Sequence, residues 1–218
     1  MSLGISALEI RAGRADDAAF IAHTILMAQR GPRPSGWFDI ALAQDEPKVL
    51  EFIAKLAVAK PRSWYHVSQF LIAEIDGKPA AALCAMPSRE TRDTMRSALE
   101  EAALATGLSD TDLAGVFARG NYARGCWIQG GEADWLIEHV ASLPAARGRG
   151  LVQALIARAL SAGRAAGFSR ASISFLIGND AAERCYAKAG FALAEEKRDA
   201  AFEAITGAPG FRRFTRAI

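Results

Sequence analysis

Hydrophobic and polar positions repeat with two different periods along the chain, and each change of period marks an element that we expect. A short alternating run at residues 8–11 predicts a strand, and the apolar-periodic residues 18–27 behind it predict a helix. Residues 30–36 are dense in glycine and proline, which is typical of a loop. An acidic pair before Pro47 suits a helix start, so the apolar positions that follow predict a second helix.

The clearest hairpin lies in the middle of the chain. Two β-prone runs, residues 67–74 and 79–86, flank an Asp-Gly dipeptide that favours a tight turn. Residues 89–119 then become helical and polar with a break at 106–107, and we interpret residues 88–132 as an insertion between strands. Aromatic residues at 37–38 follow the first loop without a clear period, and we interpret them as the wall of a pocket.

The carboxyl half alternates strands with helices. The order is strand, glycine loop, helix, strand, helix and two final strands, at residues 135–143, 147–150, 151–166, 172–177, 181–189, 191–197 and 211–215. Because a helix joins the first two of these strands, we expect them to run parallel in a sheet that is otherwise mostly antiparallel. Strand alternation places Glu138, Val140 and Ser142 on one face and His139 on the other.

Composition and charge narrow the class of protein. The 218 residues are 51% hydrophobic and 23% charged, which suits one ordinary globular domain spanning residues 1–218. The 26 basic and 24 acidic residues leave a formal charge of +2, too small for a chain that mainly neutralises nucleic-acid phosphates. Any anion site must therefore be local, and we expect no nucleic-acid partner.

Cysteine and histidine usage predicts neither disulfides nor metal. Cys84, Cys126 and Cys185 are an odd number without a Cys-x-x-Cys pair, and His23 and His66 lack acidic or cysteine partners at ligand spacing. No basic and apolar leader opens the sequence, and no uninterrupted apolar run reaches the length of about 18 residues that a spanning helix needs. We therefore expect no metal and no membrane partner, and a cytoplasmic location.

A loop of glycine and arginine is the first candidate for chemistry. Residues 147–152 read Arg-Gly-Arg-Gly-Leu-Val between a strand and a helix, which would gather unpaired N–H groups at the positive helix end. Such a point binds phosphate or pyrophosphate. The alternative is a tight turn whose glycines only allow close packing. No Walker lysine follows, and Gln153 replaces the third glycine of the dinucleotide fingerprint.

The second candidate follows the next strand. Residues 179–191 read Asn-Asp-Ala-Ala-Glu-Arg-Cys-Tyr-Ala-Lys-Ala-Gly-Phe, in which Asn179 suits a helix cap and Gly190 a helix end. Tyr186 lies one helical turn after Ala182 on the same face. Taken alone, Tyr186 is either a core aromatic residue or a proton donor.

Together the two stretches resemble the GNAT superfamily of N-acetyltransferases. Residues 147–152 are similar to that family's Arg/Gln-x-x-Gly-x-Gly/Ala loop, except that Val152 stands where the loop ends in glycine or alanine. Residues 179–191 are similar to its Asn-x-x-Ala-x-x-x-Tyr-x-x-x-Gly-Phe segment. The resemblance covers about residues 135–191 and implies an α/β fold of the α+β kind: a single domain with a mixed, mostly antiparallel sheet flanked by helices.

The resemblance also implies a site for acetyl-CoA as co-substrate. Its pyrophosphate would rest on the backbone of the glycine loop, and its pantetheine amides would pair with backbone groups near Val140 and Ser142 on a splayed strand. The residues implied in binding are Val140, Ser142, Arg147, Gly148, Arg149, Gly150, Leu151, Val152 and Asn179.

Two side chains are implied in the transfer itself. Tyr186 would protonate the departing thiolate, and Glu138 would take the proton of the attacking amine. For Glu138 the alternative is a solvated charge or an ion pair. His139 is interpreted as a packing or hydrogen-bonded residue, and Cys185 as an inert buried thiol.

The resemblance implies an N-acetyltransferase that moves an acetyl group to a primary amine of a small molecule or peptide by direct attack. The alternative is a non-catalytic domain of the same fold that binds acyl-CoA as a sensor or interaction module. A nucleotide- or nucleic-acid-binding protein that uses the basic loop is disfavoured by the near-neutral total charge and by the absence of an array of basic and aromatic residues. Candidates for the acceptor pocket are residues 31–38, the insertion with Tyr122 and Trp127, and residues 206–211. The alternative for their aromatic side chains is a place in the core or in a dimer contact, and a homodimer is left open.

Overall fold

A seven-stranded sheet organises the chain in the computed structural model, which describes residues 8–88, 94–128, 131 and 134–218. Its spatial order is β1 (Leu8–Ala12), β2 (Phe70–Ile75), β3 (Lys78–Pro87), β4 (Trp135–Ser142), β5 (Arg170–Leu176), β7 (Gly210–Ala217) and β6 (Ala192–Arg198). Only β4 and β5 pair in parallel, and every other pairing is antiparallel. The predicted mixed, mostly antiparallel sheet and its parallel pair are confirmed.

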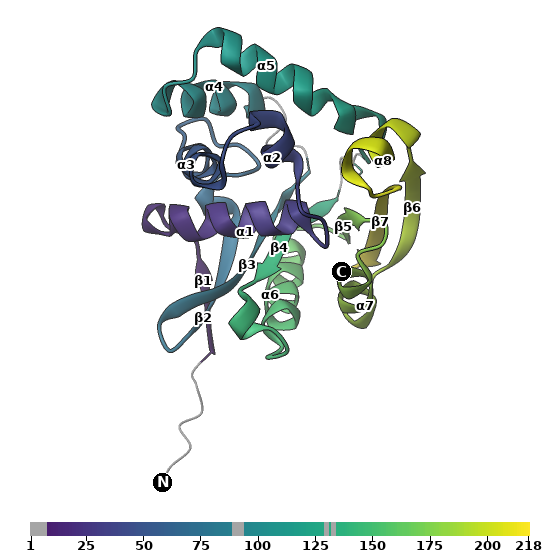
Figure 1. Ribbon diagram of the computed structural model, residues 1–218. Helices are drawn as coiled ribbons and strands as arrows, with labels where there is room; N and C mark the ends of the chain where they lie inside the picture. The colour runs from purple at the N-terminus through teal and green to yellow at the C-terminus, as the bar shows by residue number, and fades with distance from the viewer. Residues whose placement is uncertain (1–7, 89–93, 129–130, 132–133) are drawn as a thin grey trace.

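Helices cover both faces of the sheet (Figure 1). They are α1 (Ala18–Arg30), α2 (Trp37–Leu42), α3 (Glu46–Ala57), α4 (Met95–Ala105), α5 (Asp110–Gly120), α6 (Leu151–Ala165), α7 (Asp180–Lys188) and α8 (Ala200–Thr206). Short 3-10 turns complete the connections: η1 (Ala15–Asp17), η2 (Val67–Gln69), η3 (Asn121–Gly125) and η4 (Pro144–Ala146). The helical flanks agree with the predicted α/β class.

The two faces of the sheet bury separate hydrophobic clusters. One cluster packs α1 to α5 against β2 and β3, and its largest fully buried side chains include Phe38, Phe52 and Phe70. The other packs α6 and α7 against the opposite face, around Leu155 and Phe175. Burial of this apolar surface is the main force that holds the two helical layers to the sheet.

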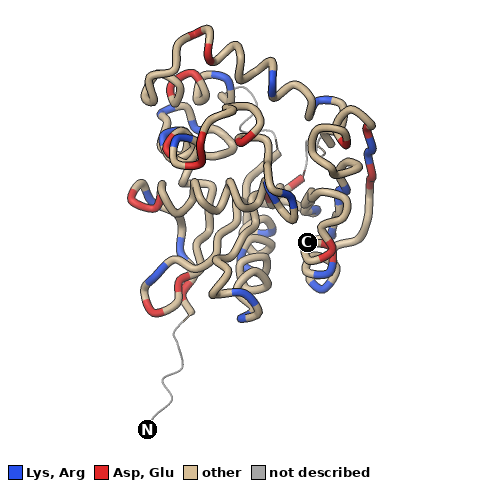
Figure 2. The backbone as a smooth tube through the Cα atoms, viewed as in Figure 1, with Lys and Arg blue, Asp and Glu red and all other residues tan. Residues whose placement is uncertain are grey.

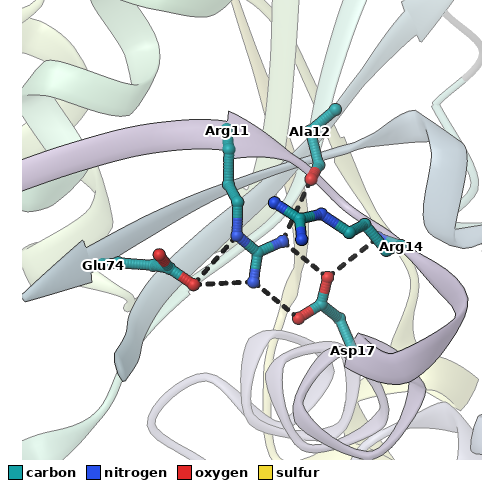
Figure 3. A network of polar contacts seen from close by, with 5 residues as sticks. All are labelled: Arg11, Ala12, Arg14, Asp17 and Glu74. Atoms are coloured by element: carbon teal, nitrogen blue, oxygen red, sulfur yellow. Dashed lines mark hydrogen bonds and ion pairs between the residues drawn. The ribbon is translucent and has the colours of Figure 1, made fainter. Parts of the chain in front are cut away.

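A buried ion-pair network holds the edge strand β1 in place (Figure 3). The Arg11 guanidinium donates to Glu74 of β2 at 2.6 Å and to Asp17 of η1 at 2.7 Å. Asp17 also accepts the backbone N–H of Arg14 at 2.8 Å. The hydrogen bond from Arg11 lowers the pKa of Asp17 below its ordinary value. The network therefore joins the first two strands to the start of α1.

The structure corrects two expectations about short helices. Residues 37–42 form α2 and not an irregular segment, because Asp39 accepts the N–H of Gly36 at 2.7 Å and pairs with Arg30 at 2.6 Å. Phe38 is fully buried in the core and is no pocket wall. The unexpected helix α8 begins where Asp199 accepts the N–H of Phe202 at 2.8 Å.

The segment interpreted as an insertion forms the layer above α2 and α3 (Figure 1). Helices α4 and α5 are separated by a break at Thr106 and Gly107, as predicted, although the predicted helical start at residues 89–93 lies outside the described residues. Helix α5 packs on α2, where the Trp37 indole donates to the carbonyl of Gly120 at 3.0 Å. The segment is therefore part of the body of the fold.

Acidic and basic side chains are interspersed along the backbone (Figure 2). Within the part of the chain that the structure describes, no helix combines the length and the apolar character that crossing a membrane requires. The same described residues contain no group of three His, Cys, Asp or Glu side chains placed to hold a metal ion.

Candidate active site

Strand β4 carries a bulge at His139. Its backbone pairs Glu138 with Cys84 and Ala141 with Ala82 of β3, so β4 contains one residue more than its partner between these points. His139 takes up the extra length with a φ of +51°, an uncommon conformation for a residue with a side chain.

The bulge resets the alternation of side chains along β4. The His139 ring lies 5.0 Å from the Tyr65 ring and 6.2 Å from that of Phe70, on the face where Cys84 and its partner Glu138 lie. Val140 packs instead against the hydrophobic cluster that α6 and α7 form on the other face. The prediction that Glu138 shares a face with Val140 and Ser142, opposite His139, is therefore wrong. The prediction that His139 packs against its neighbours is confirmed by its aromatic contacts.

Strands β4 and β5 separate next to the bulge at His139. Their parallel pairing comprises Trp135–Ala171, Leu136–Ser172 and Ile137–Ile173, although β5 continues to Leu176. Beyond Ile137 the β4 backbone therefore has no partner strand on this side within the described residues. Backbone N–H and C=O groups that face an opening of this kind are free to bind a ligand.

A cleft of about 1590 Å³ occupies this divergence. All eleven residues singled out from the sequence line it: Glu138, Val140, Ser142, Arg147, Gly148, Arg149, Gly150, Leu151, Val152, Asn179 and Tyr186. The cleft extends from the glycine loop to α5 and η3, so donor and acceptor groups could enter one continuous space.

The glycine loop presents backbone donors to the cleft. Gly148 and Gly150 have φ of +75° and +77°, and a β-carbon on either would meet no atom within 4 Å. Gly150 is the N-cap of α6 and has no side chain to accept the N–H groups of the first turn. With the positive end of the helix dipole, these donors and the open space beside them suit a pyrophosphate. Val152 packs partly into the α6 cluster.

A side-chain contact that sequence reasoning missed joins the two helices beside the cleft. Gln153 of α6 donates to the carbonyl of Cys185 in α7 at 2.8 Å, with its sulfur at 3.3 Å. Cys185 is half-buried and lines the cleft, so its predicted full burial is wrong, although burial still raises the pKa of the thiol. Asn179 caps α7 as predicted by accepting the N–H of Ala182 at 3.2 Å.

Tyr186 has an anchored ring and a hydroxyl without a protein partner. Its side chain is 6% exposed, and its ring packs edge-on against Phe175 at 5.5 Å. No described residue forms a hydrogen bond with the hydroxyl, although Tyr186 lines the cleft. Burial raises the pKa of Tyr186 above its ordinary value, so the hydroxyl keeps its proton and is a donor.

Glu138 is a half-buried carboxyl group with neither an ion pair nor a hydrogen bond to any described residue. Burial raises its pKa to about 8. The carboxylate also raises the pKa of Tyr186 and of Tyr65, so it lies within electrostatic range of both. An unpaired carboxyl with a pKa near neutrality is suited to accept and release a proton.

Aromatic side chains form much of the remaining wall. They come from the three regions expected for the acceptor pocket and from segments that the pattern did not indicate: Trp37, Trp64, Tyr65, Phe117, Tyr122, Trp127, Phe202 and Phe211. Trp64 and Tyr65 lie in an aperiodic stretch before β2, so no signal in the sequence could have assigned them to the cleft.

Comparison with known proteins identifies the family. The model of the Acetyltransferase (GNAT) family matches residues 40–191. An N-acetyltransferase from Staphylococcus aureus Mu50 has a similar structure, with a TM-score of 0.69, 19% identity and coverage of 95% of this chain and 100% of the other. None of the curated proteins matches the sequence.

Two further structures share the fold. A putative acetyltransferase from Salmonella typhimurium with its cofactor acetyl-CoA has a TM-score of 0.54, 16% identity and coverage of 97% of this chain and 94% of the other. A polyamine N-acetyltransferase from Drosophila melanogaster has a TM-score of 0.53 and 16% identity, with coverage of 97% and 100%. At these identities they show the fold alone, whereas the family match spans more than half of the sequence: the chain belongs to the GNAT acetyltransferase family, whose acyl donor is acetyl-CoA.

Proposed function

We propose that this chain is an acetyl-CoA-dependent N-acetyltransferase that acetylates a primary amine of a small molecule or peptide by direct attack. The observation that carries the proposal is the cleft at the β4–β5 divergence, which brings an unpaired carboxyl, an unpaired tyrosine hydroxyl and an anion cradle together. The similar polyamine N-acetyltransferase, by its name an enzyme that acetylates amines, supports an amine acceptor.

The donor side of the cleft would hold acetyl-CoA through backbone groups. The first turn of α6 and the loop at Gly148 and Gly150 would bind the pyrophosphate, with Arg147 and Arg149 adding positive charge. The unpaired backbone of β4 near Val140 and Ser142 would bind the pantetheine amides. Acetyl-CoA supplies the activated acetyl group as a thioester.

The proposed proton transfers use Glu138 and Tyr186. The Glu138 carboxylate accepts a proton from the substrate ammonium, which frees the nitrogen lone pair to attack the carbonyl carbon. The C–N bond forms as the C–S bond breaks, and the sulfur keeps the electron pair. Tyr186 donates its hydroxyl proton to that sulfur, and the second nitrogen proton returns to Tyr186 through solvent. The products are an N-acetyl amide and free coenzyme A.

An assay of acetyl transfer tests the proposal. Purified protein with acetyl-CoA and a panel of amines should release coenzyme A and form an N-acetyl product of the expected mass. Calorimetry on the same sample should show acetyl-CoA binding. Binding without turnover of any amine would favour the alternative, an acyl-CoA sensor or interaction module. The cytoplasmic location and the homodimer stay predictions.

A further inference from the structure

The acceptor side of the cleft differs in character from the donor side. We infer that the acceptor is a primary monoamine carried on an aromatic body, an arylalkylamine in chemical class. The inference rests on the proposed function and narrows its substrate. Three features carry it: the aromatic wall, the single unpaired carboxyl and the lack of a described cation paired with that carboxyl.

The aromatic wall is built from segments far apart in the sequence. Trp64 and Trp127 meet edge to face, with ring centroids 5.3 Å apart and an interplanar angle of 89°. Beside them, the Tyr65 ring stacks on His139 at 5.0 Å. Perpendicular rings present both edges and faces to a ligand. Aromatic rings prefer edge-to-face and offset-stacked contacts, and this wall offers both. An aromatic body would therefore find complementary surfaces beside Glu138.

The acidic groups in the described lining of the cleft can pair with only one ammonium group of a substrate. Glu138 and Glu195 are its carboxylates, and Glu195 already pairs with Arg213 at 3.0 Å. Glu138 alone is unpaired. A second ammonium or a guanidinium would lose its hydration without gaining an opposite charge, which is strongly unfavourable. The charge pattern therefore disfavours diamines, polyamines and agmatine.

No cation in the described lining of the cleft forms an ion pair with Glu138. Arg147 and Arg149 lie in the glycine loop, and Lys188 is the last residue of α7. Arg124 and Lys197 are exposed, and the Lys197 ammonium donates to the carbonyl of Trp127 at 3.3 Å. His139 stays neutral because burial lowers its pKa to about 3. A carboxylate on the carbon that bears the amine would thus lie beside Glu138 with no cation to pair with it. Free amino acids are disfavoured for this reason.

A panel of matched amines tests the inference. With saturating acetyl-CoA, we expect kcat/KM for 2-phenylethylamine to exceed that for agmatine and 1,4-diaminobutane by about 100-fold or more. Phenylalanine, which adds only a carboxylate to 2-phenylethylamine, should lose a similar factor. Hexylamine, which keeps an apolar body without a ring, should also fall below 2-phenylethylamine.

The outcomes separate this inference from the proposed function. Equal or faster acetylation of agmatine, the diamine or hexylamine would overturn the arylalkylamine inference and leave the N-acetyltransferase function standing. Turnover of none of these amines or of a wider amine panel, with acetyl-CoA shown to bind, would overturn the proposed function itself.

A variant at the mouth of the cleft supplies a second test. Trp127 is 44% exposed, so Trp127→Ala should leave folding intact while raising KM for 2-phenylethylamine about tenfold, with KM for acetyl-CoA unchanged. Trp127→Phe should restore most of the loss. Leu104→Ala on α4, where Leu104 is 81% exposed and outside the cleft, should change neither constant. An unchanged amine KM in Trp127→Ala would contradict the inference.

Discussion

Glu138 gives the reaction an expected pH dependence. Burial raises its pKa to about 8, so the group is protonated below that pH and cannot accept a proton from the amine. We expect kcat/KM for the amine to rise as pH increases through about 8 and expect Glu138→Gln to lack this rise. Initial rates from about pH 6 to about pH 10 would test this, and parallel profiles would remove Glu138 from the base role.

The same Glu138 side chain should make the folded state less stable as pH rises, whereas it should make the protein more active. Because the folded state favours the neutral acid, wild-type stability should decline as pH rises from the ordinary carboxyl pKa of about 4.3 toward 8. Glu138→Gln lacks this ionisation. The melting temperature of the variant minus that of the wild type should therefore increase as pH rises. This measurement is a check that does not depend on turnover.

Tyr186→Phe separates proton donation from packing. The variant keeps the ring against Phe175 and removes a hydroxyl that has no described protein partner, so the melting temperature should change little. Turnover should fall by about 10²-fold, the low end for a lost general acid, because a thiolate is a good leaving group. Near-wild-type turnover in the folded variant would exclude Tyr186 as the acid.

At the scale of elements, the first turn of α6 is predicted to bind the donor. Gly150→Asp would place negative charge at the anion cradle, and we expect acetyl-CoA affinity to fall below detection by calorimetry. Gly167→Asp is a matched control beyond the other end of α6, where φ is +84° and the space is equally open. Equal affinities in the two variants would show that the loop is only a turn.

The Arg11 network supports a prediction about the edge of the sheet. Arg11→Met would leave Asp17 and Glu74 buried without their cation, so we expect a loss of about 3–5 kcal/mol in the free energy of unfolding near neutral pH. The lowered pKa of Asp17 means that its contribution is present above the ordinary carboxyl pKa and is lost as pH falls through the folded value. Denaturant unfolding at neutral and acidic pH should show the difference shrink in acid.

Elements with a strong pattern were predictable from the sequence. The hairpin around Gly77, the helix from Leu151 and the capped helix after Asn179 formed as expected, and both the family resemblance and the fold class are confirmed. Helix α2 is too short to show a period, and its start depends on one carboxylate, Asp39.

The candidate site divides in the same way. Its proposed donor side consists of contiguous motifs, so the sequence indicated those residues directly. Its proposed acceptor side is built by tertiary contacts among Trp64, Trp127 and other distant residues that no local pattern connects. The bulge was also beyond prediction, because His139 is neither a glycine nor a turn residue and its positive φ depends on the strands around it.

At the scale of the whole molecule, the sheet is two half-sheets, β1–β4 and β5–β7–β6, joined directly by the three residue pairs from Trp135–Ala171 to Ile137–Ile173. A donor bound to the free β4 backbone would add hydrogen bonds next to these three pairs and would hold the two half-sheets together. Without bound donor, the protein should therefore open at this junction more easily than elsewhere. Hydrogen exchange should show acetyl-CoA slowing the amides of residues 138–142 most, together with β5, whereas uniform protection would contradict this. Bound acetyl-CoA would then also stabilise the sheet. Release of coenzyme A would loosen the same junction between the half-sheets at which the next acetyl-CoA binds.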